Sequence, residues 1–209
     1  MLKRALILSL ATAAFASPAA PAPATTMKTL AGSTVASGSW SSGTLKSGTS
    51  SHFEGGAAGD VDCVSSTLGG TLGTNPFTPS VALGLTSLTF GGCTDTIPFV
   101  TVSGVTTNAG TGANVKTATA TYVTPGTSST FAIVGLAFTF TFSSGQTCIY
   151  EPLGGTATAT HNSNTGNNEY AFNVTLTKTG GTFAFCPNPL TWTATYVLSS
   201  GGGGITIQP

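Results

Sequence analysis

The chain has 209 residues, of which 40% are hydrophobic and only 6% are charged. Six lysine and arginine residues balance six acidic residues, so no basic surface exists to displace counterions from nucleic-acid phosphates or to hold an anionic membrane. These numbers exclude a nucleic-acid-binding protein, and the large apolar fraction excludes a disordered chain because it can build a buried core.

Residues 1–24 are predicted to form a signal peptide. Lys3 and Arg4 precede the apolar run ALILSLATAAFA, and the small residues of SPAAPAPA follow it. Cleavage fits after either Ala16 or Ala24, and we favour Ala24. The apolar run has about twelve residues, fewer than the ~20 that span a bilayer, so we expect export and removal rather than insertion into a membrane.

Most of the remaining chain alternates apolar residues with threonine. Residues 25–59 are rich in serine and glycine, and we expect a lead-in there with room for a first strand or two. From residue 60 to 209, a period of two predicts strands that bury one face. The strands are expected at 81–90, 97–105, 115–123, 131–142, 155–161, 169–178, 182–185 and 190–198.

The predicted fold is all-β. No stretch of ten or more residues has a helical period, and Gly-Gly pairs at 69–70, 91–92 and 180–181 are typical of turns between strands. Threonine suits an outer face because its β-branch favours extended backbone without adding charge. We therefore expect residues 60–209 to form an antiparallel β-sandwich, or a jelly-roll-like double sheet.

Two segments of the chain resemble each other. CVSSTLGGT begins at Cys63 and CIYEPLGGT begins at Cys148, so a cysteine and four residues precede Leu-Gly-Gly-Thr in both. An internal duplication and chance both remain open as explanations. Four cysteines behind an export signal predict two disulfides, and of the three pairings the repeat favours Cys63–Cys93 with Cys148–Cys186. Their wide spacing argues against a zinc site.

Several motifs resemble those of known secreted proteins. SGTLKSG at 42–48, SLTFGGCT at 87–94 and FCPNPLTWTATY at 185–196, together with the signal peptide and the cysteine layout, resemble a family of small secreted all-β four-cysteine proteins of actinobacteria. More distantly, the chain is similar to secreted bacterial proteins described as activators of alkane oxidation. The second resemblance implies contact with a hydrocarbon surface or a biofilm. Neither resemblance supplies a functional residue.

The residues that catalysis requires are few. His52 and His161 are each isolated in the sequence, and no Gly-x-Ser-x-Gly, phosphate-binding loop or His-Glu-x-x-His is present. Glu151 and Glu169 flank a predicted strand and resemble a glycosidase carboxylate pair only by that placement. We expect a protein that is not an enzyme, with an uncharacterised hydrolase as the minor alternative, and that carries no cofactor.

Two weak binding candidates stand out. Glu54, Asp60 and Asp62 lie within nine residues of one another, which suits calcium, although we favour ordinary solvated acids at the start of a strand. Trp40, Trp192, Tyr150 and Tyr196 could stack on a sugar ring if exposed, and Trp40 is the best candidate because it lies among small polar residues. Trp192 alternates with apolar residues, so we expect it in the core.

Two functions fit this sequence. The first is a structural or interaction protein of the cell exterior, associated with the cell wall, an apolar surface or copies of itself. Few lysines protect its strand edges, and low charge weakens repulsion between molecules. The alternative is an extracellular module that binds a glycan or another ligand through exposed aromatic residues such as Trp40.

Overall fold

The computed structural model describes residues 24–122, 129–161 and 168–208. The predicted signal peptide, apart from Ala24, falls outside these residues. Within them, no helix has the length and hydrophobicity needed to cross a bilayer.

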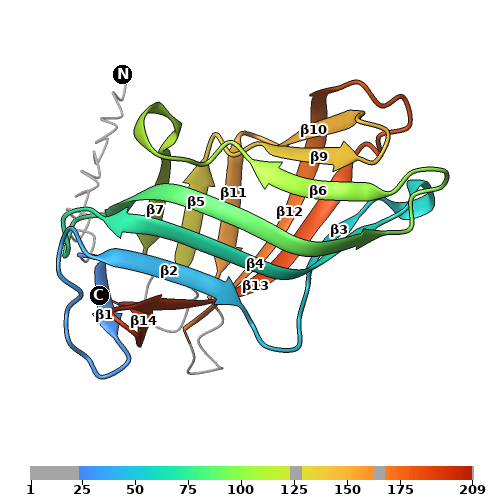
Figure 1. Cartoon of the computed structure of the whole chain (residues 1–209). Helices are drawn as coiled ribbons and strands as arrows, with labels where there is room; N and C mark the ends of the chain where they lie inside the picture. Colours follow the sequence, from blue (N-terminus) through green and yellow to red (C-terminus); the bar gives the residue numbers. More distant parts are fainter. Residues whose placement is uncertain (1–23, 123–128, 162–167, 209) are drawn as a thin grey trace, which may run out of the picture.

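Strands make up nearly all of the regular structure (Figure 1), and every strand pairing is antiparallel. Two short 3-10 turns are the helical elements of the described residues. The elements in chain order are β1 (Thr26–Thr29), β2 (Trp40–Leu45), β3 (Ser51–Glu54), η1 (Gly56–Ala58), β4 (Val61–Leu72), β5 (Ser80–Asp95), β6 (Val102–Thr107), η2 (Gly112–Asn114), β7 (Lys116–Thr121), β8 (Thr130–Val134), β9 (Phe138–Phe142), β10 (Thr147–Pro152), β11 (Thr156–Thr160), β12 (Glu169–Gly181), β13 (Leu190–Ser200) and β14 (Gly203–Gln208).

The sheet closes on itself. Its strands follow the order β13-β2-β4-β5-β7-β8-β11-β12, and β12 then pairs with β13 to complete an eight-stranded barrel with extra strands attached. The prediction of a β-sandwich or jelly roll is therefore wrong. Alternation along a strand fixes which face is buried, but a closed barrel and a double sheet bury alternate residues in the same way.

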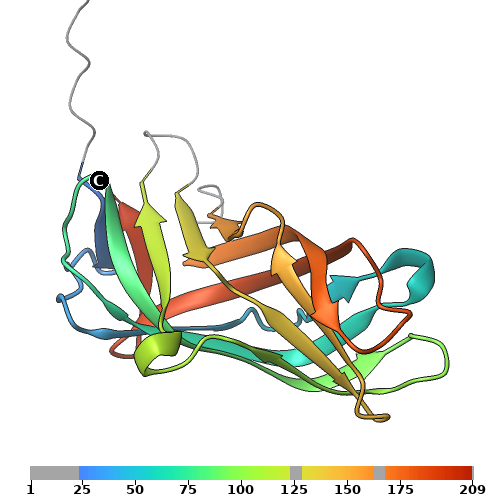
Figure 2. The same cartoon turned by 90° about the horizontal axis from the view of Figure 1, so that it is seen from above.

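The extra strands lengthen one end of the barrel. The first half of β5 pairs with β7, and the first half of β12 pairs with β11. Both β5 and β12 continue beyond these shorter partners. The second half of β12 pairs with β10, and β9 and β6 follow in order. β6 then lies alongside the second half of β5 (Figures 1 and 2), where Thr107 Oγ1 donates to the Leu88 carbonyl at 2.9 Å.

The stretch expected as a lead-in, residues 25–59, contributes three strands. β2 and β3 follow one another along the gap between β4 and β13, and each pairs with both of these neighbours. β1 pairs with β14 beyond the barrel wall, and its Met27 side chain is fully buried. These strands are thus part of the sheet.

The barrel interior is packed with aromatic side chains whose polar atoms have partners. Phe172 stacks on Trp192 with ring centroids 4.6 Å apart, and both rings are buried. Trp192 Nε1 donates to Ser51 Oγ at 2.9 Å, and the Tyr196 and Ser66 hydroxyls lie 2.6 Å apart. Buried polar groups without such partners would destabilise the core, so these bonds allow large amphipathic rings to fill it.

Three predicted strands differ locally. The stretch 131–142 is divided into β8 and β9 at Gly135, whose φ of 70° breaks the extended backbone. The stretch 97–105 becomes strand only at Val102, and 182–185 is a loop. In these two stretches, a short apolar run with a proline within it or close to its end therefore forms a loop rather than a strand.

Two of the predicted Gly-Gly turns lie inside strands, at 69–70 in β4 and at 91–92 in β5. At Gly70 the register with β5 shifts, and a Cβ atom there would lie 2.5 Å from the Gly84 carbonyl oxygen. Glycine is required at this bulge because the two backbones approach closely, not because the chain turns.

The repeated segments adopt different structures. Gly154 and Gly155 form a turn with φ values of 81° and 76°, whereas the matching pair at 69–70 continues β4. The disulfides are Cys63–Cys93 and Cys148–Cys186, the pairing that the repeat favours. The first joins directly opposed residues of β4 and β5, but the second joins β10 to the loop after β12. An internal duplication is not reflected in the fold.

Buried tyrosines should make the fold sensitive to alkali. Burial raises the pKa of Tyr150, Tyr170 and Tyr196 above the ordinary value of 10.0. The folded state holds these phenols in their neutral form, whereas in the unfolded chain they ionise near pH 10. Their contribution to stability is therefore complete below pH 10 and is lost as the pH rises toward the pKa values of the folded state. We expect the free energy of unfolding, measured by urea denaturation, to stay level up to about pH 9 and then fall.

The control is Tyr196→Phe, which removes one titrating group and should make the alkaline fall shallower. A free energy of unfolding that stays level well above pH 10 would contradict the burial of these hydroxyls.

Candidate functional site

The acidic residues considered as a calcium site do not converge on one point, and Asp60 and Asp62 have different hydrogen-bond partners. Asp62 Oδ1 accepts from Ser50 Oγ at 2.9 Å and lies 3.0 Å from His52 Nδ1. Asp60 Oδ1 accepts the Gly55 N–H at 2.9 Å, and Glu54 is exposed at the end of β3. In the described part of the chain, no three His, Cys, Asp or Glu side chains are grouped so that they could hold a metal ion.

The glutamates that resembled a glycosidase pair lie at opposite ends of β12. Glu151 is opposite Thr177, whereas Glu169 begins β12 and forms an ion pair with Lys46 at 2.9 Å. Eight residues of strand separate these points, or about 26 Å at 3.3 Å per residue. Glycosidase carboxylates lie within ~10 Å of each other, so these two do not form such a pair.

The aromatic residues considered for sugar stacking have different environments. Trp192, Tyr150 and Tyr196 are all buried in the core. Trp40 begins β2 opposite Thr71, and its side chain lies outside the described part of the structure. Near it is an open polar hollow of about 490 Å³, lined by Ser39, Ser42, Ser199, Ser200, Gly201 and Gly202.

An apolar cleft of about 360 Å³ opens at the long end of the molecule, away from β1 and β14. Three segments that are distant in the sequence meet there (Figures 1 and 2): η1, the loop between β5 and β6, and the loop between β12 and β13. Its lining residues are Ala58, Ile97, Pro98, Phe99, Phe183, Phe185 and Cys186.

Two phenylalanines at this cleft are strongly exposed. Phe99 has 104% of its reference accessible surface and Phe185 has 77%, whereas Phe183, two residues before Phe185, is buried. We call Phe99, Phe185 and the loops that carry them, 96–101 and 182–189, the aromatic tip. Single exposed hydrophobic residues are common, but two exposed rings on converging loops form a patch of the kind that marks interaction sites.

Asp95 fixes the first loop of the aromatic tip. Its Oδ1 accepts the Ile97 N–H at 3.2 Å and its Oδ2 accepts the Val102 N–H at 2.6 Å, so one carboxylate joins both ends of the loop. Between them, Phe99 adopts a φ of 71°, a left-handed conformation that is unfavourable for a bulky residue. Such conformations cost about 1–3 kcal/mol and persist where the surrounding structure holds them, commonly at functional sites.

The base of that loop packs on η1 backbone to backbone. A Cβ at Gly59 would lie 2.7 Å from the Ile97 Cα, so only glycine permits this approach. The Thr96 N–H donates to the Asp60 carbonyl at 2.9 Å, and the Asp60 N–H donates to Thr96 Oγ1 at 2.9 Å. Asp60, a weak metal-ligand candidate from the sequence, is thus part of the support of the aromatic tip.

The second loop is attached by a disulfide and by side chains. Cys186 is bonded to Cys148 of β10, and the Tyr150 hydroxyl donates to the Pro187 carbonyl at 2.9 Å. Lys178 Nζ donates to the Phe183 carbonyl at 3.3 Å, and the Phe183 ring lies 5.8 Å from that of Phe185. Both loops are therefore held in place by bonds to the barrel.

The chemistry available at the aromatic tip is that of apolar contact. Neither loop contains a charged residue, and the cysteine in the lining is oxidised. Full burial of a phenylalanine side chain contributes about 1.5–3 kcal/mol, so the two rings offer about 3–6 kcal/mol before association costs. Association costs lower the net binding energy below this range, which suits weak and reversible attachment.

The sequence pattern predicts strands where the two loops of the aromatic tip lie. Phe99 lies in the predicted strand 97–105 and Phe185 in 182–185. Pro98 precedes the first ring and Pro187 follows the second, and proline is disfavoured inside strands. The run IPFV also breaks the alternation with threonine that characterises the barrel strands.

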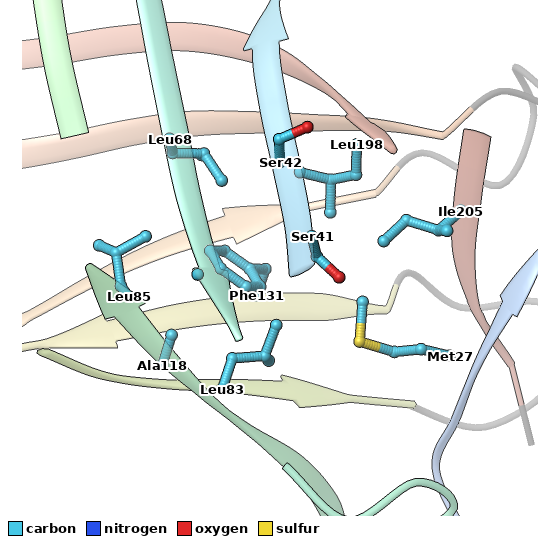
Figure 3. Close-up of a pocket in the computed structure, with 11 residues that line it drawn as sticks. Met27, Ser41, Ser42, Leu68, Leu83, Leu85, Ala118, Phe131, Leu198 and Ile205 are labelled. Carbon is cyan, nitrogen blue, oxygen red and sulfur yellow. The ribbon is translucent and has the colours of Figure 1, made fainter. Parts of the chain in front are cut away.

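A second hollow lies inside the barrel near β1 (Figure 3). It measures about 20 Å³, room for about one water molecule, and apolar side chains including Met27, Leu198 and Ile205 surround it. The Ser41 hydroxyl points into it, is buried, and has no hydrogen-bond partner among the described residues. The space is too small for an organic ligand, so the interior of the barrel is not the candidate site.

Compared with known proteins, the chain matches no protein-family model, no curated protein and no solved structure. The resemblance to the actinobacterial four-cysteine proteins therefore remains a prediction. Any function must be argued from the geometry of this molecule.

Removal of the Ser41 hydroxyl should stabilise the protein. Because that group is buried without a partner, Ser41→Ala is expected to raise the free energy of unfolding by about 1 kcal/mol in urea denaturation. The matched control is Ser42→Ala on the same strand, whose Oγ lies 3.0 Å from Ser199 Oγ. That variant should be neutral or slightly less stable; destabilisation by Ser41→Ala would show that the Ser41 hydroxyl has a partner.

Proposed function

We propose that this is a secreted, non-catalytic interaction protein of the cell exterior, which attaches to an apolar partner surface through the aromatic tip. The observation that carries the proposal is the exposure of Phe99 and Phe185 on two loops that are each bonded to the barrel. Exposed rings on rigid loops lose little conformational entropy on binding, so a small apolar contact retains most of its energy.

Two features support the extracellular location. Disulfides persist in oxidising compartments, and this chain has two and no free cysteine in its described part. Residue Thr25, directly after the favoured cleavage position, is buried and hydrogen-bonded in both directions to the backbone of Phe77. The residue after the favoured cleavage position is thus part of the folded protein.

The structure favours attachment by the aromatic tip over attachment by strand edges. Barrel closure removes the edges of eight strands, and side chains or neighbouring strands cover others. At β1, Asn75 Oδ1 accepts the Met27 N–H and Asn75 Nδ2 donates to the Met27 carbonyl, both at 2.9 Å. This amide takes the place of a strand partner, so edge-to-edge self-assembly has less support than the sequence suggested.

A glycan-binding module is the alternative. Its support is the open hollow lined by serine and glycine near Trp40, which offers hydroxyl and backbone groups to a sugar. The Ser42 and Ser199 hydroxyls already bond each other, which reduces what this hollow offers to a ligand. The aromatic tip therefore supports an apolar partner more directly.

Loss of the two rings should abolish attachment to an apolar surface. We expect the wild-type mature chain to be retained on octyl-agarose beads, and the double variant Phe99→Asn/Phe185→Ser to be retained at least tenfold less because both rings have gone. Asparagine is chosen at 99 because it tolerates the left-handed backbone. Bead depletion assays measure retention, and circular dichroism checks that the variant is folded.

The matched control is Phe77→Ser, which removes a ring of 54% exposure beside β1, far from the aromatic tip. Equal retention of the double variant and the wild type would refute the proposal. Capture on insoluble polysaccharide that depends on Trp40 and not on the aromatic tip would favour the glycan-binding alternative instead.

A further inference from the structure

We infer that the partner of the aromatic tip is a lipid layer without net charge, and that Phe99 and Phe185 enter it to the depth of their side chains. This inference rests on the proposed function and names the partner of the same site. It describes peripheral attachment of two loops, which differs from insertion of the chain across a membrane.

The small area of the aromatic tip argues against a protein partner. A phenylalanine side chain buries roughly 200 Å² in a contact, so the two rings together supply about 400 Å². A stable protein interface needs about 800 Å² on each partner, and a second copy of this chain would bring only the same small patch. A fluid apolar layer adapts its shape to the protrusion and needs no complementary surface. The full exposure of Phe99 suits such insertion.

Several backbone groups in the loops that carry the two rings have partners within the protein. Asp95 takes the N–H groups of Ile97 and Val102, and the Phe183 N–H donates to the Thr147 carbonyl at 3.1 Å. The Phe183 carbonyl accepts from Lys178, and Pro98 has no N–H to satisfy. Backbone groups that are bonded within the protein can approach an apolar phase at much lower cost than free ones.

The charges nearest the aromatic tip do not favour an anionic surface. Asp60 and Asp95 lie at the base of the first loop, and Lys178 at the base of the second directs its ammonium group to a protein carbonyl. Surfaces that bind anionic lipids carry clusters of lysine and arginine, and the described residues contain four lysines and no arginine. Attachment should therefore depend little on salt or on lipid charge.

The position of the aromatic tip is compatible with this orientation. The two loops and η1 lie at one end of the elongated barrel, and β1, β14 and the C-terminal end lie at the other (Figures 1 and 2). The molecule can therefore orient its long axis away from the lipid surface, with the aromatic tip in the lipid layer and the rest of the barrel outside that layer.

The test is co-flotation of the oxidised mature chain with phosphatidylcholine vesicles, and with the same vesicles containing an anionic phospholipid, at low and high salt. We expect equal partition in all four conditions. Phe99→Asn and Phe185→Ser should each lower partition about tenfold, and Phe77→Ser should leave it unchanged.

Insertion itself is read from a tryptophan placed at the tip. Phe99→Trp should shift its emission to shorter wavelength with vesicles and be quenched by brominated lipid, whereas the control Phe77→Trp should show neither change. This readout separates entry into the apolar layer from adsorption to its surface.

Each other outcome overturns the inference. Partition that requires anionic lipid or falls steeply with salt would show electrostatic attachment. Tip-dependent dimers in sedimentation without vesicle binding would identify a second copy as the partner. Octyl-agarose retention without vesicle binding would refute a lipid partner but leave the proposed function intact. Absence of both retention and vesicle binding would refute the proposed function and the lipid partner together.

Discussion

β12 and β13 pair over eight residues, from Glu169 opposite Val197 to Leu176 opposite Leu190, and this pairing joins the two ends of the barrel sheet. Closure gives every strand of the barrel an inner and an outer face. The inner faces carry large rings such as Phe172 and Trp192, which stack across the junction itself. In a chain with 6% charged residues, few side chains are available to protect open strand edges, and closure reduces that need.

The long end of the molecule follows from the same arrangement. β5 and β12 are longer than the strands beside them, so their second halves project beyond the first ring and carry β6, β9 and β10. The loops that leave these projecting ends form the aromatic tip. Asp95 at the end of β5 and the Cys148–Cys186 disulfide beside β12 then fix the positions of the two loops. A rigid barrel thus presents two apolar rings at the end opposite to β1 and β14 (Figure 1).

The sequence predicted what depends on local pattern. Tyr170, Phe172, Val174 and Leu176 face inward as their alternation indicates, and Trp192 lies in the core as expected. Closure could not be predicted in this way, because residues 169 and 197 are paired by the geometry of the whole sheet. The Leu-Gly-Gly-Thr repeat was misleading, since its glycines serve a bulge in one copy and a turn in the other.

The candidate site was hidden for a related reason. Charged and polar groups are the usual sequence signs of a site, but the clustered acids of this chain serve local structure: Asp60 supports the loop of Phe99 and Asp62 binds Ser50. Phe99 and Phe185 are far apart along the chain, so only the fold brings their loops together. Prolines next to both rings were the available signal that these segments leave the strand pattern.

The claim that a closed barrel presents a preformed aromatic tip is tested most directly by amide hydrogen exchange, followed residue by residue by NMR. The Ile97 and Val102 amides, which Asp95 holds, should exchange slowly in the wild type and much faster in Asp95→Asn, while amides along the β12–β13 junction stay protected in both. Exchange of Ile97 and Val102 at the rate of an unstructured peptide in the wild type would contradict the account.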